Sequence, residues 1–89
     1  MDIIWDKEKN EWLKMNRNIS FEKISELIEK ENYIKVTENP SRKTQDIFII
    51  TFQNYTWIVP FVVSDKNEVV LKTAYPSRKF HKIYGGNHG

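Results

Sequence analysis

The first third of the chain carries apolar residues at the spacing of an α-helix, and most of the remainder carries strand-like runs. One set recurs at helical spacing with charged residues between its members: Phe21, Ile24, Leu27 and Ile28. Ser20 precedes this set as a candidate N-cap, and Ile19 and Ile24 are placed to form a hydrophobic staple around it. The pattern predicts an amphipathic helix that packs on another layer of the protein.

A shorter apolar segment, Ile3-Ile4-Trp5, opens the chain ahead of this helix. Asp6 follows it as a candidate N-cap, and the next residues predict a first helix that runs to about Asn16. Tryptophan side chains are large and apolar, so we expect all three to contribute to the core. They are Trp5, Trp12 and Trp57.

Four later runs are rich in β-branched and aromatic residues, which favour strands. They cover residues 33–37, 46–52, 55–63 and 69–74. Gln53-Asn54 is short enough for a tight hairpin with Asn at positive φ, and residues 65–67 predict a second turn. Pro60 lies inside the third run. Because proline has no N–H group, we expect it at a bulge or an unpaired edge position.

The order of these elements predicts an α+β fold. Two N-terminal helices would pack on one face of a four-stranded antiparallel sheet, and a short basic helix or turn would follow the last strand. Because two helices cover only one side of a sheet, we expect the opposite face to be solvated or to receive a partner or substrate.

The 89 residues support one domain, which we place at residues 1–86, with 87–89 as a flexible tail that includes His88. Gly85-Gly86 would end the last helix. The chain has no cysteine, which excludes disulfides and thiolate metal sites and fits a reducing cytoplasm. No apolar run reaches the roughly 18 residues of a membrane helix. We therefore expect a cytoplasmic protein with no membrane partner.

Charge is distributed unevenly along the chain. The whole sequence has a formal net charge of +2. Residues 1–45 carry nine basic and nine acidic side chains, whereas residues 66–89 carry five basic side chains and only Glu68, a net charge of +4. Exposed charges are screened beyond roughly 10 Å, so this local cluster matters more than the total. The pattern indicates a phosphate-binding surface near the C-terminus.

The motifs of several enzyme classes are absent. The chain has no Gly-rich phosphate loop, no zinc-binding pair of histidines or cysteines and no Gly-x-Ser-x-Gly motif. Any catalysis is therefore expected to need no metal or cofactor. RNA carries its own nucleophile in the 2′-hydroxyl, so its cleavage needs only proton transfer and charge stabilisation at the phosphate. Arg, Lys, Tyr and His side chains can supply both.

The candidate site residues lie mainly in the C-terminal quarter. The predicted catalytic residues are Arg78, Lys79, His81, Lys72 and Tyr75, and the predicted RNA-binding residues are Lys82, Tyr84, Arg42 and Lys43. Arg78 and Lys79 would bind the scissile phosphate, and Arg favours bidentate contacts. His81 or a tyrosine would transfer the proton. A metal site is not expected.

Each assignment has a structural alternative. The basic residues could form a solvated turn, and Lys72 could be an ordinary exposed strand lysine. His81 could be a surface residue, and Tyr75 and Tyr84 could stack on bases or close the edge of the core. Arg42 and Lys43 could belong to a solvated loop.

Two segments resemble the BrnT family of small ribonuclease toxins, within the RelE-like group of type II toxin–antitoxin systems. The opening matches at Trp5, Asp6, Lys9, Ser20, Phe21 and Glu22, and the closing strand 70–74 with Ser77-Arg78-Lys79 and Tyr84 is similar to the family's ending. The chain has Asn16-Arg17-Asn18 where the family has Lys-His-Gly. Arg78 is the basic residue nearest to the family's closing arginine.

The resemblance implies a metal-independent endoribonuclease that cleaves mRNA and inhibits translation. It also implies a cognate antitoxin that masks the basic surface with acidic or apolar segments, in a hetero-oligomer that binds DNA only through the antitoxin. The alternative from the residues themselves is a module without catalysis, whose basic C-terminal sheet edge binds nucleic acid or another protein.

Overall fold

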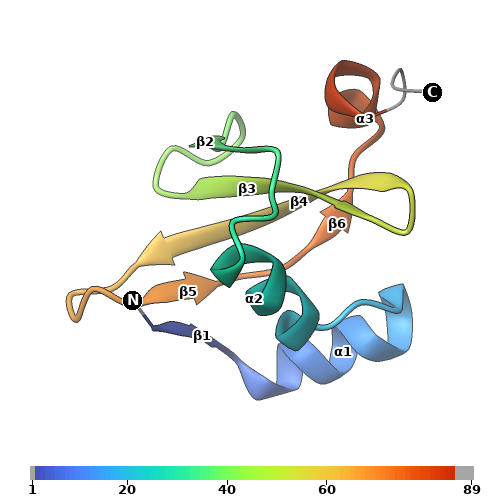
Figure 1. Cartoon of the computed structure of the whole chain (residues 1–89). Helices are drawn as coiled ribbons and strands as arrows, with labels where there is room; N and C mark the ends of the chain where they lie inside the picture. The colour runs from blue at the N-terminus through green and yellow to red at the C-terminus, as the bar shows by residue number, and fades with distance from the viewer. Residues whose placement is uncertain (1, 86–89) are drawn as a thin grey trace.

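A computed structural model describes residues 2–85, which form three helices and a mixed sheet of six strands (Figure 1). The elements follow one another as β1 (Ile3–Trp5), α1 (Lys7–Arg17), α2 (Phe21–Glu29), β2 (Lys35–Glu38), β3 (Asp46–Phe52), β4 (Tyr55–Val63), β5 (Val69–Leu71), β6 (Tyr75–Pro76) and α3 (Arg78–Tyr84). The α+β class is as predicted. The expected tail at residues 87–89, with His88, lies outside the described residues. Within residues 2–85, no helix is both long and apolar enough to cross a membrane.

The first two helices begin where their capping residues predict. Asp6 is the N-cap of α1, and its Oδ1 accepts a hydrogen bond from the backbone N–H of Glu8 at 3.3 Å. Ser20 is the N-cap of α2, and its Oγ accepts from the N–H of Lys23 at 3.1 Å. These bonds satisfy N–H groups that have no partner inside the helix, so both N-terminal ends are defined locally.

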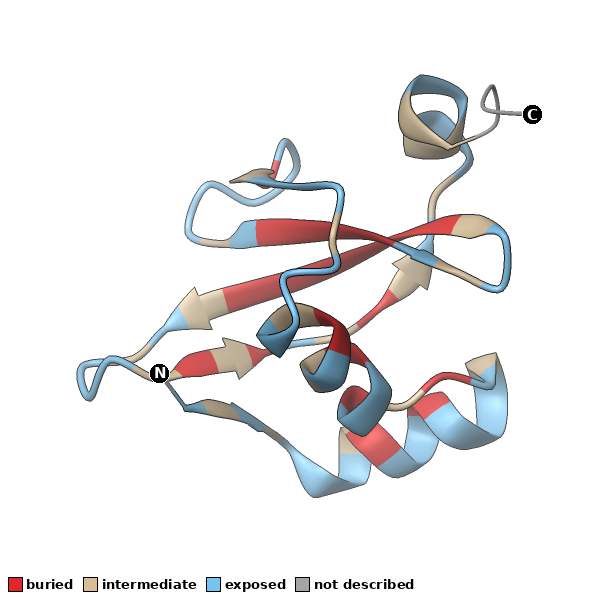
Figure 2. Cartoon of the chain, in the orientation of Figure 1, coloured by how far each residue is buried: buried red, intermediate tan, exposed pale blue. Residues whose placement is uncertain are grey.

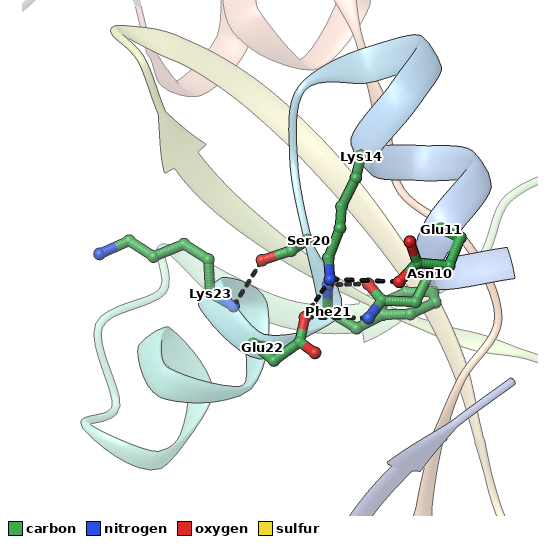
Figure 3. Close-up of polar contacts among 7 residues, drawn as sticks. All are labelled: Asn10, Glu11, Lys14, Ser20, Phe21, Glu22 and Lys23. Carbon is green, nitrogen blue, oxygen red and sulfur yellow. Dashed lines mark hydrogen bonds and ion pairs between the residues drawn. The ribbon is translucent and has the colours of Figure 1, made fainter. Parts of the chain in front are cut away.

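Asn10 joins the two helices (Figure 3). Its side chain is buried, with 3% of its surface exposed. The Oδ1 atom accepts from the N–H of Phe21 at 2.8 Å, and Nδ2 donates to Glu22 Oε1 at 2.9 Å. Phe21 is the first residue of α2, so Asn10 satisfies a further unpaired N–H of that helix and sets how α2 follows α1.

The main core lies between these helices and one face of the sheet, where the buried residues gather (Figure 2). Leu13 of α1 and Phe21 and Ile24 of α2 are fully buried there. Phe48 of β3 stacks on Phe61 of β4 with ring centres 4.4 Å apart. Ile19 and Ile24 both lie in this core, as the predicted hydrophobic staple requires.

The sheet has more strands than the four predicted, and it is not purely antiparallel. Its order is β1-β5-β4-β3-β2, with β6 also paired to β4. The opening segment Ile3–Trp5 forms an edge strand parallel to β5, with Ile4 opposite Val70. The prediction of four antiparallel strands was therefore wrong in this respect. A three-residue apolar segment carries no period of its own, and its pairing depends on residues more than 60 positions away.

Pro60 lies opposite the break between β5 and β6, where the predicted strand 69–74 ends early at Leu71 and Tyr75–Pro76 forms a further strand. Phe61 pairs with Leu71 and Ile58 with Tyr75, so residues 72–74 contain one residue more than the opposite part of β4. The carbonyl of Pro60 accepts from the N–H of Lys72 at 2.9 Å, so the nitrogen that lacks a hydrogen faces this bulge. Proline stands at a bulge, as expected for a residue that cannot donate to the ladder.

The second face of the sheet is partly covered, and the expectation that it is open was wrong there. Three residues of this face are at most 1% exposed: Ile47, Ile49 and Ile58. Tyr75 and two residues of α3, Phe80 and Tyr84, pack against them. The sheet therefore lies between α1 and α2 on one side and the short α3 on part of the other.

The tryptophans divide between core and surface. Trp57 is 7% exposed and its Nε1 donates to the carbonyl of Phe52, and Trp5 packs partly buried against the core. Trp12 is 42% exposed, so its assignment to the core was wrong. Lys9 Nζ lies 4.4 Å and Arg17 Cζ 4.8 Å from the centre of its ring. Cations on an aromatic ring stabilise it at the surface.

Candidate functional site

The C-terminal helix α3 carries most of the predicted site residues, and its ends are locally defined. Ser77 Oγ accepts from the N–H of Phe80 at 3.2 Å, which makes Ser77 the N-cap. The N–H of Gly85 donates to the carbonyl of His81 at 2.9 Å and ends the helix. The N–H of Ser77 donates to the carbonyl of Thr56 at 3.0 Å, which joins the start of α3 to β4.

Two faces of α3 have different roles. Phe80 and Tyr84, four positions apart, pack towards the sheet, and their ring centres are 6.1 Å apart. The opposite side presents three exposed basic residues, which we call the α3 basic face: Arg78, Lys79 and Lys82. Phe80 therefore belongs to packing, and the hydrophobic spacing of α3 determines which way its cations point.

His81 lies between these two faces and its ring is held in one orientation. The Nδ1 atom lies 3.0 Å from Thr56 Oγ1, and the ring stacks on Tyr55 with centres 4.2 Å apart. Thr56 is fully buried, so its hydroxyl needs a partner inside the protein. Nε2 makes no hydrogen bond to another residue in the range 2–85. The imidazole is therefore anchored through one nitrogen, and the other has no partner among the described residues.

Gly85 provides the space for this arrangement. A Cβ atom at position 85 would overlap both Thr56 Oγ1 and His81 Nδ1. The φ angle of Gly85 is −114°, which any residue can adopt. Gly85 is therefore needed for the close approach of α3 to Thr56 and not for its backbone conformation. The position of His81 thus depends on three residues: Thr56, Tyr55 and Gly85.

Several basic residues of α1 and α2 have partners for their side chains. On α1 and α2, Lys14 lies 3.3 Å from Glu11, and Lys23 lies 2.9 Å from Glu26. Arg17 Nη1 donates to the carbonyl of Ala74 at 2.6 Å. In contrast, the side chains of Arg78, Lys82 and Lys72 make no ion pair or hydrogen bond within the described part of the chain. Arg78 and Lys82 are four positions apart on α3, where like charges repel.

Tyr75 packs beside α3, whereas Lys72 lies farther along the sheet. Lys72 is exposed and follows β5, where its N–H bonds to Pro60. Pro60 is four residues from Thr56, or about 13 Å along β4. Tyr75 lies opposite Ile58 in β6 and packs half-buried against the second core cluster. The structure therefore brings Arg78, Lys79, His81 and Lys82 together on one helix, and separates Lys72 from His81 along the strand.

The two other predicted RNA-binding residues lie farther away. Arg42 and Lys43 are exposed in the loop before β3, at the end opposite the β3–β4 hairpin. Asp46 begins β3, and Thr51, opposite Thr56, lies five residues or about 17 Å further along the strand. This loop and the α3 basic face are therefore not parts of one small site.

No family model, curated protein or solved structure matches this chain.

Two hollows of the described surface lie away from the predicted site residues. One cavity of about 320 Å³ lies beside the start of α2 and is lined by Lys14, Asn18 and Lys23 among others. A larger cleft of about 570 Å³ lies beside the end of α2. None of the predicted catalytic or RNA-binding residues lines either one. The side chains of the α3 basic face are exposed, which suits contact with an extended polyanion.

Three residues of the site were missed by the sequence interpretation: Thr56, Tyr55 and Gly85. Thr56 and Tyr55 lie in a strand of almost continuous apolar and β-branched residues, which gives no sign that they contact His81. Gly85 was interpreted only as a helix stop. Their role becomes visible only when α3 is placed against β4, because 25 residues separate Thr56 from His81.

Proposed function

We propose that this protein binds RNA on the α3 basic face and cleaves it without a metal ion. The proposal is supported mainly by one arrangement. Arg78 and Lys82, both without a partner in the described residues, flank a histidine whose ring is oriented by Thr56 and whose Nε2 is left for a ligand. One anionic group could be contacted by both charges of this helix turn and by the imidazole.

The chemistry would be transesterification at a phosphodiester. A base takes the proton of the 2′-hydroxyl, the 2′-oxygen attacks phosphorus, and the bond from phosphorus to the 5′-oxygen breaks. The leaving oxygen receives a proton, which gives a 2′,3′-cyclic phosphate and a 5′-hydroxyl. In this scheme His81 transfers a proton through Nε2, and Arg78 and Lys82 stabilise the charge that develops on the phosphate.

The repulsion between neighbouring cations supports an anionic ligand. Like charges four positions apart on a helix destabilise it by a few tenths of a kcal/mol, and α3 has no acidic residue to compensate. A phosphate backbone would remove this repulsion and release counterions, so binding should weaken steeply with salt.

In this proposal the protein acts as a toxin of the BrnT-like type. Cleavage of mRNA would inhibit translation, and a cognate antitoxin would neutralise the toxin by covering the α3 basic face. The support is the resemblance of the opening and closing segments together with the helix pair and basic C-terminal helix. Lys79 would contribute to RNA binding, while Tyr75 and Tyr84 would act in packing beside Ile58.

The contacts of His81 also favour a second function, which is binding without cleavage. A half-buried imidazole that bonds to a buried threonine and stacks on Tyr55 has a structural role that needs no catalysis. On this account His81 fastens α3 to the sheet, and Arg78, Lys79 and Lys82 bind nucleic acid or an acidic partner.

Incubation of the purified protein with single-stranded RNA in EDTA distinguishes the two. The nuclease gives products that end in a 2′,3′-cyclic phosphate, and Arg78→Ala and His81→Gln reduce the rate by at least about 100-fold. Lys66→Ala is the matched control, because it removes an exposed cation from the β4–β5 turn and should leave the rate unchanged.

RNA that stays intact while it binds in a salt-sensitive manner would contradict the nuclease and support the binding module. Cleavage by wild type that Arg78→Ala and His81→Gln do not affect would place the site elsewhere. Growth after induced expression, with and without a neighbouring gene for an antitoxin, tests the toxin assignment separately.

A further inference from the structure

The cleft beside the end of α2 combines an apolar floor with an acidic rim. Its volume is about 570 Å³. The apolar lining comes from the sheet face that carries α1 and α2, from α2 itself and from the loop that follows α2: Ile3, Ile28, Tyr33, Phe48 and Val69. Phe48 and Val69 are each 6% exposed, so the floor is part of the main core. Helix α2, which contributes Ile28 and Glu29 to the lining, lies on the opposite side of the sheet from α3 (Figure 1).

Two glutamates line the same cleft, Glu29 and Glu31. Both are exposed, and neither carboxylate has an ion pair or side-chain hydrogen bond within residues 2–85. They stand at the C-terminal end of α2, where the last backbone carbonyls add negative partial charge. Lys30 lies between them in sequence, but its Nζ is 3.9 Å from Glu26 and therefore serves another carboxylate. Neither carboxylate of the rim is therefore held in an ion pair by a described residue.

The backbone conformation at the end of α2 determines where Glu31 lies. The N–H of Glu31 donates to the carbonyl of Ile28 at 2.9 Å, and the N–H of Asn32 donates to Leu27 at 2.8 Å. These bonds form a Schellman motif, in which the residue after the C-cap is left-handed and is usually glycine. Glu31 occupies that place with φ of 55°. A residue with a Cβ is strained there, yet the position carries a carboxylate at the edge of the cleft.

We propose that this cleft binds a partner protein segment in which an apolar side chain is flanked by Lys or Arg. The apolar side chain enters between Ile28 and Val69, and its neighbouring cations pair with Glu29 and Glu31. The chemistry follows from complementarity, because an acidic rim disfavours an acidic segment and an apolar floor disfavours a wholly polar one.

This interaction is independent of the proposed nuclease. The cleft opens on the layer of α1 and α2, whereas the α3 basic face lies on the other side of the sheet. An occupant of the cleft can therefore be held while RNA is bound, and it differs in charge from any partner that would mask α3. Failure of one proposal leaves the other standing.

The test uses the whole protein with labelled isoleucine and valine methyl groups and a synthetic helical peptide as probe. The peptide is rich in alanine and carries one leucine flanked by lysines. We expect methyl shifts at Ile3, Ile28 and Val69, with none at Ile58 beneath α3. Two control peptides replace the lysines with glutamate or the leucine with serine, and both should bind at least about 5-fold more weakly.

A double variant of the rim, Glu29→Gln with Glu31→Gln, should weaken binding of the lysine peptide by about 3- to 10-fold. The matched control is Glu8→Gln with Glu11→Gln on α1, which changes the net charge equally but lies away from the cleft. Absence of methyl shifts with the lysine peptide, equal binding of the glutamate peptide, or equal loss in both double variants would each overturn the proposal.

Discussion

His81 Nδ1 and Thr56 Oγ1 lie 3.0 Å apart and join the C-terminal helix to β4, the central strand of the sheet. The two atoms share one hydrogen, and whichever atom donates it, the contact orients the imidazole. A buried hydroxyl that loses its partner is costly, so the bond also stabilises the position of α3. The same contact thus serves folding and, under the proposed function, the placement of Nε2.

Replacement of Thr56 separates these roles. Thr56→Val keeps the shape of the side chain but removes the hydroxyl, and we expect a loss of about 1–2 kcal/mol in the free energy of unfolding. RNA cleavage should fall more than 10-fold, and the ¹⁵N spectrum of His81 should show a changed tautomer balance. Thr56→Ser keeps the hydroxyl and should restore the spectrum and most of the activity. Equal spectra for the Thr56→Val variant and wild type would contradict the role of the bond.

Gly85→Ala tests the space beneath the end of α3. Replacement of glycine by alanine usually stabilises a protein by about 0.4–1 kcal/mol when the backbone tolerates it. The φ of −114° does tolerate it, but the new Cβ would overlap Thr56 and His81. We therefore expect a lower melting temperature and loss of the His81–Thr56 contact. Gly85→Ser should behave in the same way, and a melting temperature above that of wild type would show that α3 can move aside without loss.

The sequence predicted best those features that depend on neighbouring residues. Asp6, Ser20 and the hairpin at Gln53-Asn54 were identified because caps and turns use local hydrogen bonds and backbone angles. Both hairpin residues have positive φ, 53° and 61°. The pairing of Ile3–Trp5 with β5 was not predictable in this way, because three residues carry no period and their partner lies near the other end of the chain.

The candidate site was predicted in part for the same physical reason. The clustering of Arg78, Lys79 and Lys82 is a property of adjacent residues, and it persists on the surface of α3. The spacing of Phe80 and Tyr84, four positions apart, is that of one helix face. Their packing on the sheet was not predicted, because the second face of the sheet was expected to be open. The dependence of His81 on Thr56 and Gly85 arises only from tertiary packing.

Asn10 provides a prediction about stability alone. Asn10→Ala leaves the buried N–H of Phe21 without its acceptor, and we expect a loss of about 1–3 kcal/mol. For a domain of this size each kcal/mol lowers the melting temperature by about 4–8 °C. Asn16→Ala is the matched control, because Asn16 is exposed and donates only to the carbonyl of Trp12, so its effect should stay within about 0.5 kcal/mol. Thermal denaturation followed by circular dichroism measures both variants.

Glu22 makes part of this stability depend on pH. The hydrogen bond from Asn10, with a smaller contribution from the charge of Lys14, lowers the pKa of Glu22 below its ordinary value of 4.5. A carboxyl group with a lowered pKa in the folded state stabilises the protein above the unfolded pKa, and this contribution disappears as the pH falls through the folded pKa.

Comparison of Glu22→Gln with wild type should therefore show a difference at pH 7 that vanishes near pH 2–3. Because Glu22 is exposed, we expect only about 0.5 kcal/mol, or about 2–4 °C in melting temperature. In an Asn10→Ala background the same substitution should have a smaller effect, since the main cause of the lowered pKa is gone. A difference that is equal in both backgrounds would show that Asn10 does not hold the carboxylate, and that Lys14 or the helix dipole provides the stabilisation instead.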